Sequence, residues 1–166
     1  MAGYGYGGYG DKPRAKTDNR DNRGNRENRP EATLPSDYLV NGYTDNTGVL
    51  DIKYITEYAE SIGRGLGSDG KTGVSKIRSY YDEVISDLTD CTYSDIQWTS
   101  VRNRVAMLKA RANNRVTKGT ASKLFFNFIS KNVDTVVGSK TEAEFKENLA
   151  NFKDHFEAVV CYLPKK

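Results

Sequence analysis

The residues whose spacing comes closest to that of a chemical site run from Gly65 to Thr72 and read Gly-Leu-Gly-Ser-Asp-Gly-Lys-Thr. They satisfy the phosphate-binding pattern G-x-x-x-x-G-K-[ST], in which backbone N–H groups cradle phosphates, the lysine reaches them and the hydroxyl holds Mg²⁺. That loop needs a buried strand before it, yet residues 54–63 have the amphipathic spacing of a helix. We therefore predict a flexible interhelical loop whose Lys71 is available to a polyanion. A small P-loop-like nucleotide-binding protein is kept as an alternative function.

A second candidate for a functional site lies between Ile96 and Lys118, where every charged residue is basic. Helical spacing places these side chains beside an apolar stripe that runs from Trp98 to Val116. A solvated helix ordinarily mixes signs, because Glu–Lys pairs one turn apart stabilise it. The charge could be compensated by an RNA backbone or by the acidic last helix, and we favour the RNA backbone. We predict an RNA-binding basic face made of Arg102, Arg104, Lys109, Arg111, Arg115 and Lys118.

Residues suited to acid–base or metal chemistry are few. His155 is the only histidine, and its place at the edge of an apolar helix stripe favours a partly buried structural role. The two cysteines, Cys91 and Cys161, lie far apart without neighbours at ligand spacing, so we expect no zinc site and find no support for a disulfide. The acidic residues of one helix are expected to form a solvated face: Asp82, Glu83 and Asp87. We therefore predict no catalytic residues, no metal and no cofactor.

Helices are expected to position these residues, because apolar side chains recur every three or four residues and no long stretch alternates. We predict an all-α fold, a single bundle of about five helices joined by short loops. The first helix is predicted over residues 50–62, and the second over 74–88 with Ser75 as its N-cap. A capping box at Ser94 is expected to open the third helix. The fourth is expected to be capped by Thr120 and to end at Gly138, and the fifth to be capped by Thr141 and to end at Pro164.

The composition changes near residue 35. Residues 1–35 hold a Gly-Tyr tract and Asn-Arg triplets with almost no large aliphatic residues, so we predict a disordered tail, either a soluble extension or an RNA-touching arm. The tail carries 7 of the 25 basic and 5 of the 22 acidic residues, which leaves 18 and 17 for a helical domain over residues 36–166. The net charge of +3 therefore does not by itself indicate a nucleic-acid partner.

No membrane partner is expected. The longest apolar run, residues 158–163, is far shorter than the ~18–20 residues of a transmembrane helix. The glycine- and tyrosine-rich N-terminus lacks the apolar region of a signal peptide. We predict a cytoplasmic protein.

Three segments together resemble one known family. The run from Gly73 to Val84 is similar to the opening helix motif of the small helical subunit of type III-A CRISPR effector complexes, the Csm complexes. The run from Arg104 to Ala112 resembles the family's basic second motif, and the run from Phe152 to Leu163 resembles its closing helix. The order and spacing of the three agree with the family over residues 73–163.

The resemblance implies a non-catalytic subunit that stacks in several copies inside a prokaryotic ribonucleoprotein for antiviral defence. Its expected partners are the target RNA, the crRNA-containing complex, the backbone and large subunits, and copies of itself. In that family, cleavage of target RNA belongs to the backbone subunit, and DNA cleavage belongs to the large subunit. The resemblance adds Lys76 and Arg78 to the expected RNA contacts. The alternative to RNA binding, besides the nucleotide-binding protein, is an all-α protein–protein interaction module.

Overall fold

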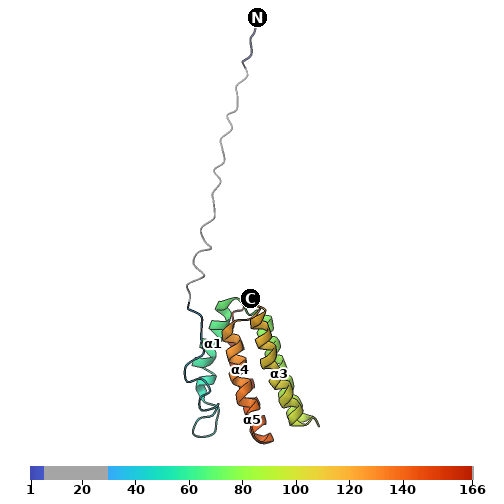
Figure 1. The fold of residues 1–166 in the computed structure, drawn as a ribbon. Helices are drawn as coiled ribbons and strands as arrows, with labels where there is room; N and C mark the ends of the chain where they lie inside the picture. Colours follow the sequence, from blue (N-terminus) through green and yellow to red (C-terminus); the bar gives the residue numbers. More distant parts are fainter. Residues whose placement is uncertain (6–29, 166) are drawn as a thin grey trace. The chain divides into compact units, whose positions relative to one another are not determined.

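A computed structural model describes residues 1–5 and 30–165, and in this part of the chain the regular structure is helical (Figure 1). A short 3-10 helix, η1 (Ile52–Tyr54), precedes five α-helices. The α-helices are α1 (Glu57–Asp69), α2 (Val74–Tyr93), α3 (Trp98–Thr117), α4 (Lys123–Val137) and α5 (Glu142–Cys161). The predicted all-α bundle of about five helices is confirmed.

Short connections make successive helices run in opposite directions along the bundle. Helix α3 packs between α2 and α4, and α5 packs against α1, α2 and α4. The core is filled by the aromatic and aliphatic stripes of these helices, with Phe125, Phe128, Phe152 and Phe156 fully buried. No helix among the described residues is both long and apolar enough to cross a membrane.

The compact unit begins at Glu31. Most of the predicted tail, residues 6–29, lies outside the described residues. Leu34 packs against the core, and Tyr38, Tyr43 and Tyr54 are buried in it. Residues 31–56 thus contribute aromatic side chains to the core without forming an α-helix.

Most of the glycine-rich run is helical, so the prediction of a flexible loop over Gly65–Thr72 was wrong for residues 65–69. Helix α1 continues to Asp69, and the helix predicted over 50–62 is shifted toward the C-terminus. The glycines permit close packing: an added Cβ would lie 2.6 Å from the Cβ of Tyr162 at Gly63, and 2.8 Å from Cδ2 of Leu124 at Gly65. Low helix propensity is outweighed here by the approach of neighbouring elements. The helix ends at Gly70, whose φ of 66° is the left-handed conformation that glycine tolerates.

Two predicted N-caps were wrong by two residues. Helix α2 begins after Gly73 rather than Ser75, and Val74, its first residue, packs against the core. Helix α4 is capped by Ser122 rather than Thr120, and the Ser122 hydroxyl accepts a hydrogen bond from the Phe125 N–H at 3.2 Å. The predicted end of α4 at Gly138 is confirmed.

The capping box predicted at Ser94 was also wrong, because Ser94 ends the preceding helix. Its hydroxyl donates to the Asp90 carbonyl at 2.6 Å and accepts from the Ile96 N–H at 3.3 Å. Helix α3 begins only at Trp98. The cap of α5 at Thr141 is confirmed, since its side chain accepts from the Glu144 N–H.

Candidate nucleic-acid interface

Helix α3 carries its basic side chains in two rows, one on each side of its exposed surface. Its buried side chains, Val101, Val105, Leu108 and Ala112, point into the core. One basic row faces α2 and the other faces α4. Between them lie exposed uncharged residues, among them Asn103, Met107, Ala110, Asn113 and Asn114.

The row that faces α2 is paired with carboxylates of that helix. The Arg104 guanidinium lies 3.0 Å from Oδ1 of Asp87 and 2.6 Å from Oδ2 of Asp90. Arg111 forms an ion pair with Glu83, and its guanidinium lies 5.8 Å from the centre of the Tyr80 ring. The middle of this row therefore holds α2 and α3 together.

Asp87 is the one carboxylate of this group that is buried, with 7% of its surface exposed. Burial raises its pKa to about 6, while the positive charge of Arg104 opposes the rise. The predicted solvated face over Asp82, Glu83 and Asp87 is thus wrong for Asp87, which lies between two helices. Glu83 is also engaged with α3.

The basic residues of the row that faces α4 also bind groups of the neighbouring helix. The Lys109 ammonium lies 2.7 and 2.8 Å from the two carboxylate oxygens of Asp134. Arg102 Nε donates to the Val137 carbonyl at 2.9 Å, at the end of α4 where carbonyl groups lack helical partners. The acids that compensate α3 therefore lie on α2 and α4, and not on the last helix.

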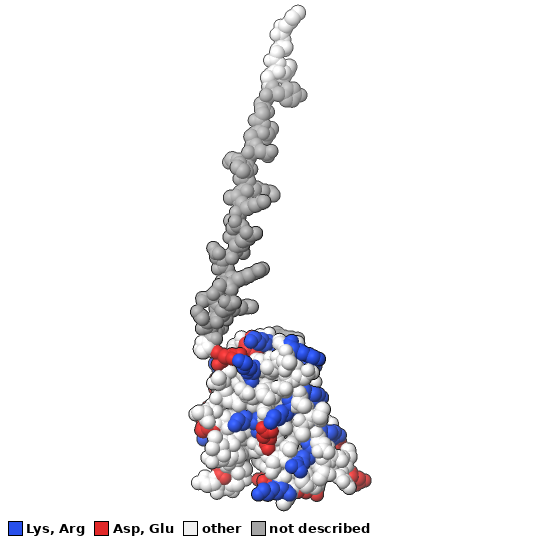
Figure 2. Space-filling view, in the orientation of Figure 1, with Lys and Arg blue, Asp and Glu red and all other residues white. Residues whose placement is uncertain are grey.

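The remaining predicted residues have no carboxylate within ion-pair distance among the described residues: Lys76, Arg78, Arg115 and Lys118. Arg115 and Lys118 lie at the C-terminal end of α3, and Lys76 lies in the first turn of α2. Because α2 and α3 run in opposite directions, these three residues are at the same end of the bundle. In Figure 2, blue side chains predominate over red on the visible face of α3 and α4 and continue to the end where these helices connect.

We name this region the cationic end, and it is formed by Lys71, Lys76, Arg115, Lys118 and Lys123. Lys71 was predicted to be available to a polyanion but was not placed on the RNA-binding face, and Lys123 was not predicted to bind RNA. Lys123 is the first residue of α4 and follows its cap, Ser122. The sequence indicated a cap at Thr120, so it could not predict that Lys123 lies beside Lys71. The cationic end and the two rows on α3 together make the candidate nucleic-acid interface.

The Gly65–Thr72 run does not have the geometry of a phosphate-binding loop. Helix α1 stands where the pattern requires a strand, so the N–H groups of its last turns point along the helix. Thr72 is 3% exposed, and its hydroxyl accepts a hydrogen bond from the Ser122 N–H at 2.9 Å. The hydroxyl that would hold Mg²⁺ therefore joins two loops, and the nucleotide-binding alternative loses its structural basis.

His155 is completely buried, which is more than the partial burial predicted. Its Nδ1 lies 2.5 Å from the Tyr54 carbonyl, which can only accept, so Nδ1 carries the proton. Nε2 then accepts from the Tyr38 hydroxyl at 2.7 Å, and that hydroxyl accepts in turn from Asn132 Nδ2. Burial lowers the pKa of His155 to about 4, so the imidazole is neutral. Both ring nitrogens form hydrogen bonds inside the core, so His155 has a structural role.

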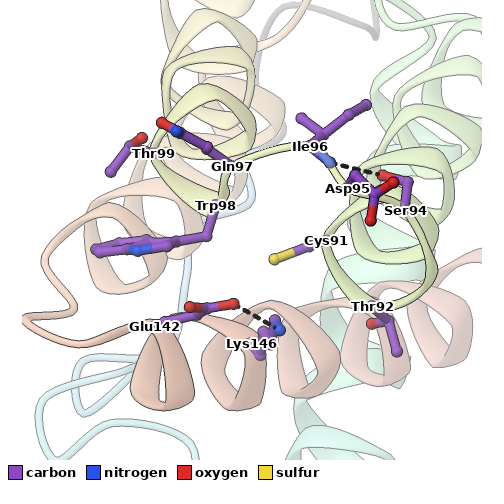
Figure 3. A pocket seen from close by; sticks show the side chains of 10 residues that line it. All are labelled: Cys91, Thr92, Ser94, Asp95, Ile96, Gln97, Trp98, Thr99, Glu142 and Lys146. Carbon is purple, nitrogen blue, oxygen red and sulfur yellow. Dashed lines mark hydrogen bonds and ion pairs between the residues drawn. The ribbon is translucent and has the colours of Figure 1, made fainter.

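A pocket of about 380 Å³ lies at the opposite end of the bundle, where the α2–α3 connection meets the start of α5 (Figure 3). Trp98 and Cys91 line it together with the ion pair between Glu142 and Lys146. Burial raises the pKa of the Cys91 thiol, which disfavours the reactive thiolate. Cys91 and Cys161 are both free, and no cluster of metal-ligating side chains occurs in residues 1–5 and 30–165.

The fold and surface define a small helical-bundle protein with a basic helix and a cationic end. A family model described as Csm2 Type III-A matches residues 50–163, about two thirds of the chain. The chain therefore belongs to the Csm2 family, whose members are subunits of type III-A CRISPR–Cas effector complexes. No curated protein and no solved structure matches it.

Proposed function

We propose that the chain is a non-catalytic structural subunit that binds target RNA inside the type III-A effector complex. The observation that carries the proposal is the absence of acidic residues from α3, together with Arg115 and Lys118 at the end of that helix, which have no carboxylate partner among the described residues. Lysine and arginine bind phosphate without regard to base sequence, which suits a subunit that must accept any target.

The paired basic residues of α3 also contribute to this proposal. The side chains of Arg104, Lys109 and Arg111 are 46%, 39% and 45% exposed, so each can reach an incoming phosphate from its present position. Arg104 and Arg111 present more donors than their carboxylates occupy. Lys76 extends the surface along α2, and exposed Asn103, Asn113 and Asn114 add donors for phosphate and ribose. Arg78 is exposed but lies about 200° around α2 from Lys76, on the side away from α3, so it would meet RNA from another direction.

The family supports the rest of the proposed assembly. Several copies stack beside the crRNA and the target strand, next to the backbone and large subunits, in the prokaryotic cytoplasm. Exposed apolar side chains fit contacts with protein neighbours: Val40, Val49 and Ile52 are 69%, 62% and 71% exposed. The same side chains are what a pure protein–protein interaction module would use, so RNA binding decides between the two functions.

The deciding experiment is a titration of single-stranded RNA with the Arg115→Gln/Lys118→Gln double variant. Neither residue has an ion-pair partner among the described residues, so the fold should be unaffected while two phosphate contacts are lost. We expect affinity to fall about tenfold at about 50 mM salt. The control is Lys53→Gln/Lys140→Gln, which removes two positive charges at the opposite end of the bundle from the cationic end and should bind like the wild type. No binding by the wild-type chain would favour the interaction module.

A further inference from the structure

Two loops meet at the cationic end and are fixed to each other by buried hydroxyl groups. The Ser122 N–H donates to Thr72 Oγ1 at 2.9 Å, and the Thr72 hydroxyl lies 3.4 Å from Ser122 Oγ. Both residues are less than 5% exposed. Lys71 and Lys123 immediately adjoin this contact, so the two lysines are held at one place although they are far apart in the sequence.

Both lysines converge on one carboxylate. Glu31 Oε1 lies 4.0 Å from the Lys71 ammonium, and Oε2 lies 3.5 Å from the Lys123 ammonium. The three side chains are 54–71% exposed, so water and salt screen the pairs. The position of Glu31 follows from the packing of the next residues, since a Cβ on Gly65 would lie 3.1 Å from the Ala32 Cβ, and Leu34 packs on the core.

Within residues 1–5 and 30–165, Glu31 is the carboxylate that these lysines face. The other nearby acid, Asp69, uses Oδ1 to accept from the N–H groups of Lys71 and Thr72, which fixes the turn after α1. No ion pair between Asp69 and a lysine occurs among the described residues. Two ammonium groups therefore hold one exposed anion of roughly the size of a phosphate group.

We propose that Lys71 and Lys123 form an RNA phosphate site at the cationic end, and that Glu31 is a built-in competitor that the phosphate displaces. The inference deepens the proposed function and rests on it, because it adds two contacts and a regulating carboxylate to the same RNA surface. Weak pairs with Glu31 keep the site occupied by an internal anion and lower its affinity for RNA. Removing that charge leaves both lysines without a carboxylate partner among the described residues, so a loss of negative charge should tighten RNA binding at this place only.

The test measures single-stranded RNA affinity of the full chain with Glu31→Gln at about 50 mM salt. We expect binding two- to fivefold tighter than the wild type. The control is Glu142→Gln, which has a closely similar exposure (53% against 54%), also pairs with a lysine, and lies at the opposite end of the bundle. It should bind as the wild type does. Equal gains in both variants would show a general effect of net charge and overturn the inference.

A double-variant comparison locates the effect. In a Lys71→Gln/Lys123→Gln background, the gain from Glu31→Gln should disappear, because the competitor then has nothing to release. A gain that persists there would overturn the inference. An unchanged affinity for Glu31→Gln, beside a tenfold loss for Arg115→Gln/Lys118→Gln, would overturn the inference and leave the proposed function intact. No RNA binding by any variant would overturn both. Thermal unfolding of each variant confirms that the compared proteins are folded.

Discussion

The middle and the end of α3 carry the same kinds of side chain in different surroundings. In the middle, Arg104 and Arg111 are paired with acids of α2, and Lys109 is paired with an acid of α4. At the end, Arg115 and Lys118 have no such partner among the described residues. The comparison separates two uses of basic charge on one helix. In the middle it joins neighbouring helices, and at the end it remains available to a ligand.

The largest expected effect concerns the buried carboxylate in the middle of the helix. The pKa of Asp87 is raised to about 6, so its stabilising contribution is present at low pH and is lost as pH rises through 6. His155, with a pKa near 4, contributes stability that is lost as pH falls from 6.5 toward 4, because only the unfolded chain takes up the proton. The two contributions oppose each other between pH 4 and 6.

In Asp87→Asn, the opposing contribution of Asp87 is absent, so the effect of His155 on the free energy of unfolding should be seen in full. Between pH 6.5 and 4 we expect this variant to lose about 2 to 3 kcal/mol more free energy of unfolding than the wild type. Chemical denaturation at several pH values measures the difference. Parallel curves for the two proteins would show that Asp87 titrates as an ordinary exposed carboxyl and would weaken the contrast between the two regions.

Charge reversal of Arg104 compares the two regions directly. Arg104→Glu removes the partner of a buried carboxylate and adds a like charge, so the free energy of unfolding should fall by about 2 kcal/mol. Arg115→Glu makes the same change at the end of the helix and should stay within about 0.5 kcal/mol of the wild type. Urea unfolding at neutral pH distinguishes them. If both variants were equally unstable, the end of α3 would be structural too.

The smallest effect is expected at Lys109. Its pair with Asp134 is exposed, so Lys109→Gln should change stability by less than about 0.5 kcal/mol. In an RNA titration the same variant should lose less affinity than Arg115→Gln, because Asp134 already competes for the ammonium. A greater loss for Lys109→Gln would place the main RNA contact on the α4 side of the helix.

The sequence predicted the bundle well because helical periodicity is a local property of α2 to α5. For the same reason, the sequence correctly placed the basic residues of α3 on one helix beside its apolar stripe. It could not predict the partners of those residues, since Asp87 and Arg104 meet only when two helices pack. The errors at Ser94 and Thr120 share a cause: each residue has the type of an N-cap, but its hydroxyl donates to a carbonyl at the end of the preceding helix, that of Asp90 and of Arg115 respectively. The run from Gly63 to Gly67 was misread because close packing, rather than flexibility, explains its glycines.

The central claim is that Arg115 and Lys118 bind RNA phosphates, since neither has a carboxylate partner in the part of the chain that the structure describes. The most direct test is the slope of log affinity for single-stranded RNA against log salt concentration. Each lost phosphate contact should reduce that slope by about 0.7, so Arg115→Gln/Lys118→Gln should reduce it by about 1.4, while Lys53→Gln/Lys140→Gln leaves it unchanged. The same slope for all three proteins would contradict the claim.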